Sequence, residues 1–209
     1  MTIPVSRFGA WLSVILLVMA TLGGCNNKSA STPPTLPSSE QQAAARSGPP
    51  EDGEAGFEIR SAAFPQGGEI PTWYTCEGQD ISPPLSWVNV PEATQSLALI
   101  VDDPDAPDPE NPQTTWVHWV LFNIPPETSG LAEGVKQLPA SAQSGLNDWK
   151  KTGYGGPCPP IGRHRYFHKL YALSTVLDLN NPTKVELEAA MQGHVLQKTE
   201  LIGTYQKKK

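Results

Sequence analysis

Two histidines and two aspartates carry side chains that could bind an anion, hold a metal or catalyse hydrolysis. Asp103 and Asp105 lie in a proline-rich acidic turn directly after an apolar run. His118 lies inside a second apolar run, where a lone histidine would more often be a packed core residue, but His164 precedes a third run and favours a shared site. A carboxylate that accepts a hydrogen bond from a histidine orients the ring and favours its charged form, which donates to anions. An anion site in which the histidines bind and the aspartates hold them is one arrangement that these residue types allow.

The same four side chains leave two other kinds of site open. Imidazole and carboxylate groups bind several divalent metals, although the spacing here matches no local metal motif. A hydrolase would need a nucleophile beside a base, or an activated water. We expect a binding protein with no catalytic residue, no metal and no cofactor. An enzyme that uses the histidines and aspartates is the alternative, and turnover abolished by His164→Ala would favour it.

Composition and charge narrow the class of protein. The chain has 209 residues and a formal net charge of -6, and its only dense basic run is Lys207-Lys208-Lys209. Nucleic acid needs a broad basic surface, so we predict no nucleic-acid binding. The 18 glycines and 22 prolines are many for a helical protein, whereas a hydrophobic content of 38% is enough for a core. These values indicate one turn-rich, mainly β domain.

The N-terminal segment has the pattern of an export signal followed by a tether. Residues 11–20 form an apolar stretch of signal-peptide length, which is short for a membrane span. The run Leu22-Gly23-Gly24-Cys25 resembles the lipobox of bacterial lipoproteins, in which the cysteine thiol takes a diacylglycerol. We predict a signal peptide at 1–24, lipidation at Cys25 and a flexible Pro/Ser-rich tether at 25–55. The protein would then be exported and anchored to a membrane of the cell envelope, and an uncleaved anchor helix is the alternative.

Residues 56–209 have the pattern of the folded domain, in which apolar runs alternate with glycine, proline and asparagine. Runs at 96–101, 116–122 and 166–173 predict strands. The first two carry apolar residues on both faces, as strands in the middle of a covered sheet do. His168 falls in the third predicted strand and is not expected to be a site residue.

One helix is predicted after Pro182, because Thr183 and Glu186 have the spacing of a capping box. Its apolar stripe would consist of Val185, Leu187, Ala190, Met191 and Leu196. His194 is expected on this helix and has no predicted role. A final strand at 199–205 would close the domain.

Two segments resemble the signature regions of the phosphatidylethanolamine-binding protein family. The first is Asp103-Pro104-Asp105-Ala106-Pro107 with Trp116 and His118, and the second is Gly156-Pro157 with His164-Arg165-Tyr166. The stretches 74–78, 81–87 and 153–160 resemble the bacterial, Raf-kinase-inhibitor-like (YbhB/YbcL-type) members, and the match runs from about Phe57 to Tyr205. The resemblance implies a mainly β fold in which two antiparallel sheets pack as a sandwich, with a few peripheral helices, one of them near the C-terminus.

The resemblance also implies a small surface pocket for phosphate, a phosphoryl headgroup or a similar anion. The residues at the matching motif positions would line it: Asp103, Asp105, Pro107, Trp116, His118, Gly156, Pro157, His164 and Tyr166. Backbone N–H groups at Gly156 would add donors. Apart from Trp116, most tryptophans of the domain (Trp73, Trp87, Trp119 and Trp149) are expected in the core.

Relatives of this kind act as inhibitors or signalling modulators. The resemblance therefore implies a non-catalytic module that binds a small anion and modulates a protein partner at the envelope. A protease or kinase inhibitor that acts through surface loops is a further alternative.

The three cysteines predict one disulfide. With Cys25 taken by lipid, Cys76 and Cys158 are left as a pair, and export places them in an oxidising compartment. Both lie in loops that the family resemblance places near the pocket. The bond would brace the pocket rim and add roughly 2–4 kcal/mol of stability. A pair of free thiols is the alternative.

Overall fold

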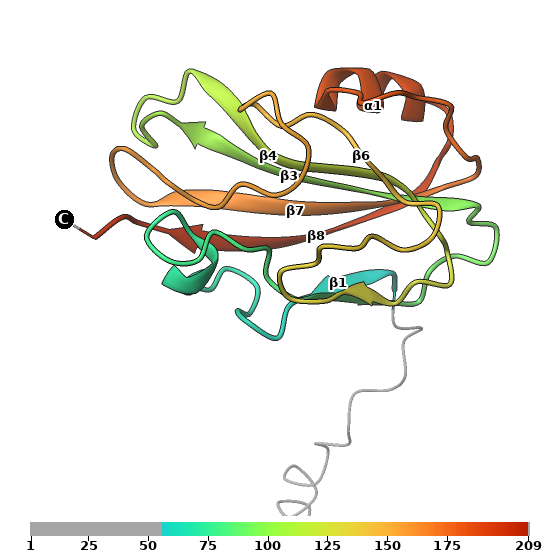
Figure 1. Cartoon of the computed structure of the whole chain (residues 1–209), viewed down its shortest axis with the longest axis horizontal. Helices are drawn as coiled ribbons and strands as arrows, with labels where there is room; N and C mark the ends of the chain where they lie inside the picture. Colours follow the sequence, from blue (N-terminus) through green and yellow to red (C-terminus); the bar gives the residue numbers. More distant parts are fainter. Residues whose placement is uncertain (1–55, 209) are drawn as a thin grey trace, which may run out of the picture. The chain divides into compact units, whose positions relative to one another are not determined.

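A five-stranded antiparallel sheet forms the centre of the domain (Figure 1). The computed structural model describes residues 56–208, and the predicted signal peptide (1–24), Cys25 and tether (25–55) lie outside the described residues. The strand order is β6-β4-β3-β7-β8. The strands are β3 (Ser96–Ala106), β4 (Thr114–Ile124), β6 (Gln143–Ser144), β7 (His164–Leu173) and β8 (Val195–Tyr205). The apolar runs of β3 and β4 are buried, which confirms their central position.

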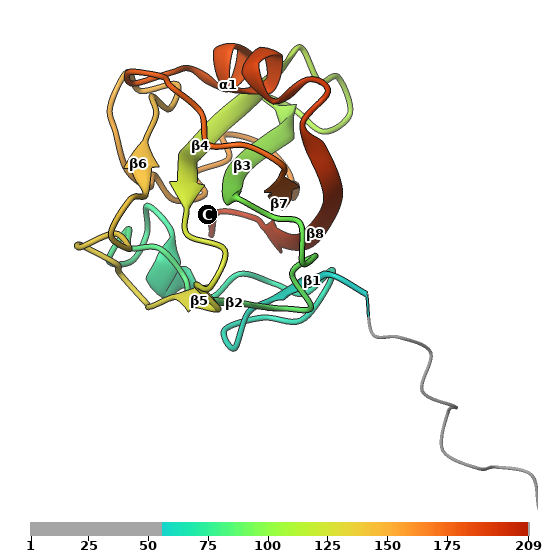
Figure 2. The ribbon, with the colours of Figure 1, turned by 90° about the vertical axis from the view of Figure 1, so that its right-hand side faces the viewer.

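A smaller antiparallel sheet packs against one face of the first (Figure 2). It consists of β1 (Glu58–Arg60), β2 (Leu85–Val88) and β5 (Gly130–Leu131), in the order β1-β2-β5. A 3-10 turn, η1 (Thr72–Tyr74), precedes β2. The two sheets enclose a core that includes Ile59, Trp87, Leu99, Trp119, Leu121 and Leu170. The predicted mainly β fold of two antiparallel sheets is thereby confirmed.

The helix α1 (Lys184–Met191) covers the other face of the large sheet (Figure 1). It begins with the predicted capping box, in which Thr183 and Glu186 satisfy each other's backbone N–H groups. Leu187 and Met191 pack against Ile100 and Phe122 of the sheet. Within residues 56–208 no helix is long and apolar enough to cross a membrane.

The helix is shorter than the sequence pattern predicted. It ends before Gly193, whose φ of 79° is unfavourable for other residues and reverses the chain. Leu196 therefore lies in β8 instead of the helix, and His194 is exposed in the turn between them. Val185, predicted for the apolar stripe, is 73% exposed. The helix was predicted too long because the apolar spacing continued past its end into a strand. Val185 lies within the helix but on its exposed side.

The acidic segment after residue 101 is a strand and not the predicted turn. β3 continues through Asp103 and Asp105 to Ala106, with irregular pairing to β4 after Val101 and again after Asp103. β7 likewise begins at His164, two residues before the predicted start. Because β4, β3 and β7 are neighbours, the polar side chains at these strand ends come together.

Asp102 is fully buried between two lysines on the helix side of the sheet. Lys169 Nζ of β7 and Lys184 Nζ of α1 lie 2.7 Å and 2.5 Å from its carboxylate oxygens. A buried carboxylate requires such partners. These ion pairs connect the first turn of α1 to β3 and β7.

His168 lies on the opposite face of β7, inside the sandwich. It is 1% exposed, and its ring is 5.5 Å from that of Phe64. The backbone groups of Tyr166 and Leu201 lie near the ring, but neither ring nitrogen has a hydrogen-bond partner among the described residues. The sequence placed His168 on a strand correctly, but it did not reveal that the ring is buried without partners.

Candidate ligand-binding site

A cavity of about 360 Å³ lies where the ends of β3, β4 and β7 meet. Four buried residues from these three neighbouring strands form its polar floor: Asp103, His118, His164 and Tyr166. Its apolar wall consists of Ala106, Pro107, Trp116, Trp149, Cys158, Pro159 and Pro160. A concave site with apolar sides and a few convergent polar groups is the usual form of a small-molecule pocket.

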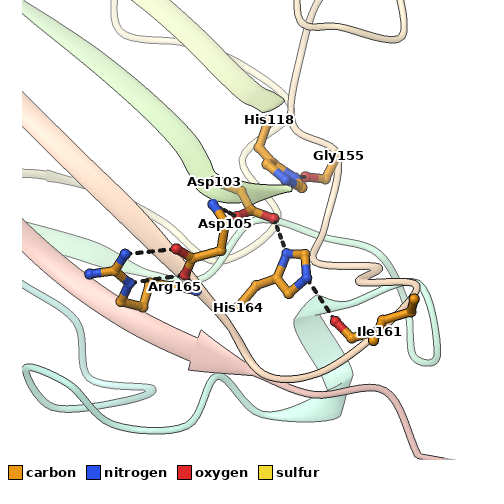
Figure 3. Close-up of polar contacts among 7 residues, drawn as sticks. All are labelled: Asp103, Asp105, His118, Gly155, Ile161, His164 and Arg165. Atoms are coloured by element: carbon orange, nitrogen blue, oxygen red, sulfur yellow. Dashed lines mark hydrogen bonds and ion pairs between the residues drawn. The ribbon is translucent and has the colours of Figure 1, made fainter. Parts of the chain in front are cut away.

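His164 is held by hydrogen bonds on both sides of its ring (Figure 3). Nδ1 is 2.7 Å from Asp103 Oδ2, and Nε2 is 2.9 Å from the carbonyl oxygen of Ile161. Because a carbonyl oxygen can only accept, Nε2 carries a proton. A second proton lies between Nδ1 and the Asp103 carboxylate. His164 therefore links β3 to the loop before β7, and neither of its nitrogens is free for a ligand.

His118 uses only one of its ring nitrogens within the protein. Nδ1 lies 2.7 Å from the carbonyl oxygen of Gly155 and therefore donates to it. Nε2 has no hydrogen-bond partner among residues 56–208, and the ring lines the cavity. Burial lowers the pKa of His118, which the carbonyl of Gly155 and the nearby Asp103 oppose. In the neutral form Nε2 is an acceptor, and it becomes a donor when the ring is protonated.

Tyr166 supplies the second free polar group of the floor. Its side chain is buried, and its hydroxyl has no hydrogen-bond partner among the described residues. Burial, with a contribution from Asp103, raises the pKa of this phenol, so it stays protonated and can donate. The Tyr166 and His118 rings are 5.2 Å apart, edge to face. A buried polar group without a partner costs free energy unless a ligand or water pairs with it.

Comparisons with known proteins show the family to which the chain belongs. The sequence profile of the family described as phosphatidylethanolamine-binding protein matches residues 60–206. The chain belongs to this family. A UPF0098 protein of Methanothermobacter thermautotrophicus is 52% identical over 155 residues, which cover 72% of this chain and 99% of the relative. A UPF0098 protein of Chlamydia pneumoniae is 46% identical over 152 residues, covering 72% and 99% of the two chains.

Solved structures show the same fold. The crystal structure of a phosphatidylethanolamine-binding protein homologue from Chlamydia trachomatis has a TM-score of 0.68 and 44% identity, and the match covers 73% of this chain and 99% of that one. Escherichia coli YbcL, described as a member of the mammalian family, has a TM-score of 0.67 and 32% identity, with 74% and 100% covered. The predicted family is therefore shown by sequence and by structure.

Three residues that the family motifs placed in the pocket lie outside its lining. The Asp105 carboxylate accepts from Arg165 Nε at 2.9 Å and Nη2 at 2.7 Å (Figure 3), and this pairing lowers its pKa. The N–H of Gly156 donates to Asp80 Oδ1 at 2.6 Å and is not available to an anion. The carbonyl of Pro157 accepts from the N–H of Cys76 at 3.1 Å. All three position the loops around the phosphatidylethanolamine-binding-protein cavity instead of lining it.

The other predicted residues, Asp103, Pro107, Trp116, His118, His164 and Tyr166, do line the cavity. The predicted lining residues left out five members of the wall: Ala106, Trp149, Cys158, Pro159 and Pro160. Trp73 and Trp149 were expected in the core with Trp87 and Trp119. Instead, Trp73 is 51% exposed on η1, and Trp149 is 40% exposed in a turn. The one available signal was that it lies next to the glycine-rich segment of the family motif.

The structure joins Cys76 to Cys158, with their Cα atoms 5.4 Å apart. The bond connects the loop after η1 to the loop between the Gly156-Pro157 part of the family motif and β7. Cys158 itself lines the cavity. The disulfide therefore fixes the loop that carries Pro159 and Pro160 in the cavity wall.

Proposed function

We propose that this chain is a non-catalytic module of the phosphatidylethanolamine-binding protein family that binds a phosphate-type anion in the cavity. One observation carries the proposal. The polar floor contains two groups without partners among the described residues, His118 Nε2 and the buried Tyr166 hydroxyl, on adjoining rings. Both suit a phosphoryl oxygen, because Tyr166 donates and His118 shares a proton with it.

The charge of the floor is compatible with an anion despite its aspartate. Asp103 is paired with His164, and its other oxygen accepts from the N–H of Asp105 at 2.8 Å. Each oxygen of the carboxylate thus accepts a hydrogen bond, and the proton that it shares with His164 offsets its charge. His164 and Asp103 hold the floor together, whereas His118 and Tyr166 contact the ligand. This division revises the prediction that both histidines bind the anion directly.

Binding of a phosphoryl group should depend on pH. The complex holds one proton between His118 Nε2 and the phosphoryl oxygen. Burial keeps the pKa of free His118 below its ordinary 6.5, and the second pKa of a phosphate monoester is about 6. Above pH 7 both partners are deprotonated before binding, so the affinity should fall roughly tenfold for each further pH unit. Calorimetric titration of the domain with phosphoethanolamine from pH 5.5 to 8.5 measures this slope.

Two variants identify the groups involved. His118→Ala should weaken binding and flatten the pH profile, and Tyr166→Phe should weaken it several-fold with the profile kept. Tyr171→Phe is the matched control. Tyr171 lies on β7, packs against the hydrophobic cluster beneath α1 and is outside the cavity lining. His194→Ala is the control for an exposed histidine. No heat of binding from phosphate or phosphoethanolamine at millimolar concentration would contradict the proposal.

The non-catalytic assignment rests on the chemistry of the cavity lining. The thiol that could serve as a nucleophile, that of Cys158, is in the disulfide. Residues 56–208 contain no group of three or more histidine, cysteine, aspartate or glutamate side chains arranged to hold a metal. Of the two histidines, His118 alone has a free ring nitrogen, and without a nucleophile beside it the cavity lacks the pair of groups that covalent catalysis needs. Phosphoester or acyl-ester turnover by the wild type, abolished by His164→Ala, would favour the hydrolase instead.

We also propose that the module acts at the cell envelope, held there by lipid on Cys25, and that it modulates a protein partner. The lipobox-like sequence supports the anchor. When the full chain is produced in a bacterium, mass spectrometry should find diacylglycerol on Cys25 and no residue before it. Cys25→Ser should leave an unprocessed chain without lipid. Unlipidated protein as the major wild-type form would contradict this prediction.

A further inference from the structure

Trp149 lies between two cavities. One is the cavity of about 360 Å³ proposed to bind phosphate, called here the phosphate-type cavity, and the other has a volume of about 370 Å³. The second cavity has a polar lining that includes Asp80, Asn147, Lys151 and Thr152. Among residues 56–208, Trp149 and Cys158 alone line both cavities. Because Cys158 is held by its disulfide, Trp149 is the side chain whose removal would open the wall between the two cavities.

The indole is seated by aromatic and backbone contacts. Its ring lies edge to face against those of Trp116 and His118, with centroids 5.4 Å and 5.2 Å apart. A Cβ added to Gly155 would approach its Cζ3 to 2.5 Å, so the close approach of the ring requires glycine there. The Asn147 side chain supports the turn by accepting from the N–H groups of Trp149 and Lys151. The position of the indole is thus built into the local structure although the residue is 40% exposed.

We propose that Trp149 sets the size of the ligand. Its indole separates the phosphate-type cavity from the second one. The protein therefore selects compact phosphoryl compounds over phosphate monoesters that carry a bulky polar group. This inference rests on the proposed function. The two cavities are of nearly equal volume, about 360 Å³ and 370 Å³, so removing the partition approximately doubles the space next to the polar floor. Polar groups of the second cavity would then become available to the longer ligand.

The test compares two phosphate monoesters, phosphoethanolamine and adenosine 5′-monophosphate. They carry the same phosphate group and differ in the size of the rest of the molecule. Calorimetry at pH 6 gives the ratio of their dissociation constants for each protein. The wild type should prefer phosphoethanolamine. Trp149→Ala should reduce this preference by roughly tenfold, which is the size of effect that opening or closing a pocket produces on a ligand that differs in bulk. Trp149→Phe should give an intermediate ratio.

Two further variants make the result specific. Gly155→Ala keeps the indole but displaces it, and it should change the ratio in the same direction as Trp149→Ala. Trp73→Ala is the control, because Trp73 is 51% exposed on η1 and lines neither cavity. It should retain the wild-type ratio.

The ratio of the two dissociation constants shows whether Trp149 separates the cavities or only supports the fold. If Trp149 only supported the fold, Trp149→Ala would weaken both ligands equally, and an unchanged ratio would overturn the inference. A wild type that binds phosphoethanolamine but shows no preference over the nucleotide would overturn it as well while leaving the proposed function intact. A wild type that binds neither compound would refute the proposed function and this inference together.

Discussion

Replacing Cys76 and Cys158 together by serine should lower the free energy of unfolding by about 4 kcal/mol. The bond closes a loop with a sequence separation of 82 residues, and the chain-entropy model gives about this value for a loop of that size. Phosphate binding should weaken too, because Cys158 and the adjacent Pro159 form part of the cavity wall. Urea unfolding of the oxidised wild type and of the double variant measures the difference.

Reductant supplies the control for this prediction. Dithiothreitol should bring the wild type close to the double variant in stability and leave the variant unchanged. Native protein from an oxidising compartment should have no alkylatable thiol at either position. Two reactive thiols in the native protein would show that the bond does not form. Equal stability of the oxidised wild type and the variant would show that the bond does not stabilise the fold.

Acid should destabilise the domain through His168. Burial lowers the pKa of this histidine from 6.5 to about 4 in the folded protein. The folded-state pKa lies below the unfolded value, so the unfolded chain takes up a proton on this histidine before the folded domain does. Stability is therefore unaffected by His168 well above pH 6.5 and is lost as the pH falls toward 4. Linkage gives a loss of about 2 kcal/mol by pH 5 and about 3 kcal/mol by pH 4.

The variant His168→Leu should remove this part of the acid sensitivity. Leucine is apolar and fits the surroundings of Phe64 and Leu201 without a group that needs a hydrogen bond. Urea unfolding between pH 7 and pH 4 should therefore show a shallower loss of stability for the variant. His194→Gln, at an exposed position, should follow the wild-type profile. Parallel profiles for His168→Leu and the wild type would exclude His168 as the source.

Long elements could be predicted from the sequence, whereas short ones could not. The strands β3, β4 and β7 have ten or eleven residues each with strong apolar runs, and the start of α1 carries a capping box. The strands β1, β5 and β6 have two or three residues. Such segments have no measurable periodicity, and their pairing is decided by contacts with distant parts of the chain.

The candidate site shows the same limit at the level of single residues. The family resemblance placed both Asp103 and Asp105 in the pocket, and in a regular strand the two side chains would indeed share a face. The irregular pairing of β3 after Asp103 separates them, and Asp105 pairs with Arg165 instead. The role of Trp149 depends on its contact with Gly155, which is not visible from either residue alone.

The polar floor and most of the apolar wall belong to different parts of the chain. The floor comes from three adjoining strands of the large sheet, whereas Trp149, Pro159 and Pro160 come from the segment between β6 and β7. Floor and wall can therefore be engineered separately. Grafting residues 146–160 from another family member, with Gly155 and the Cys158 bond retained, would change which compounds enter while the sheet keeps its register. A library confined to this segment would sample new ligands on an unchanged scaffold.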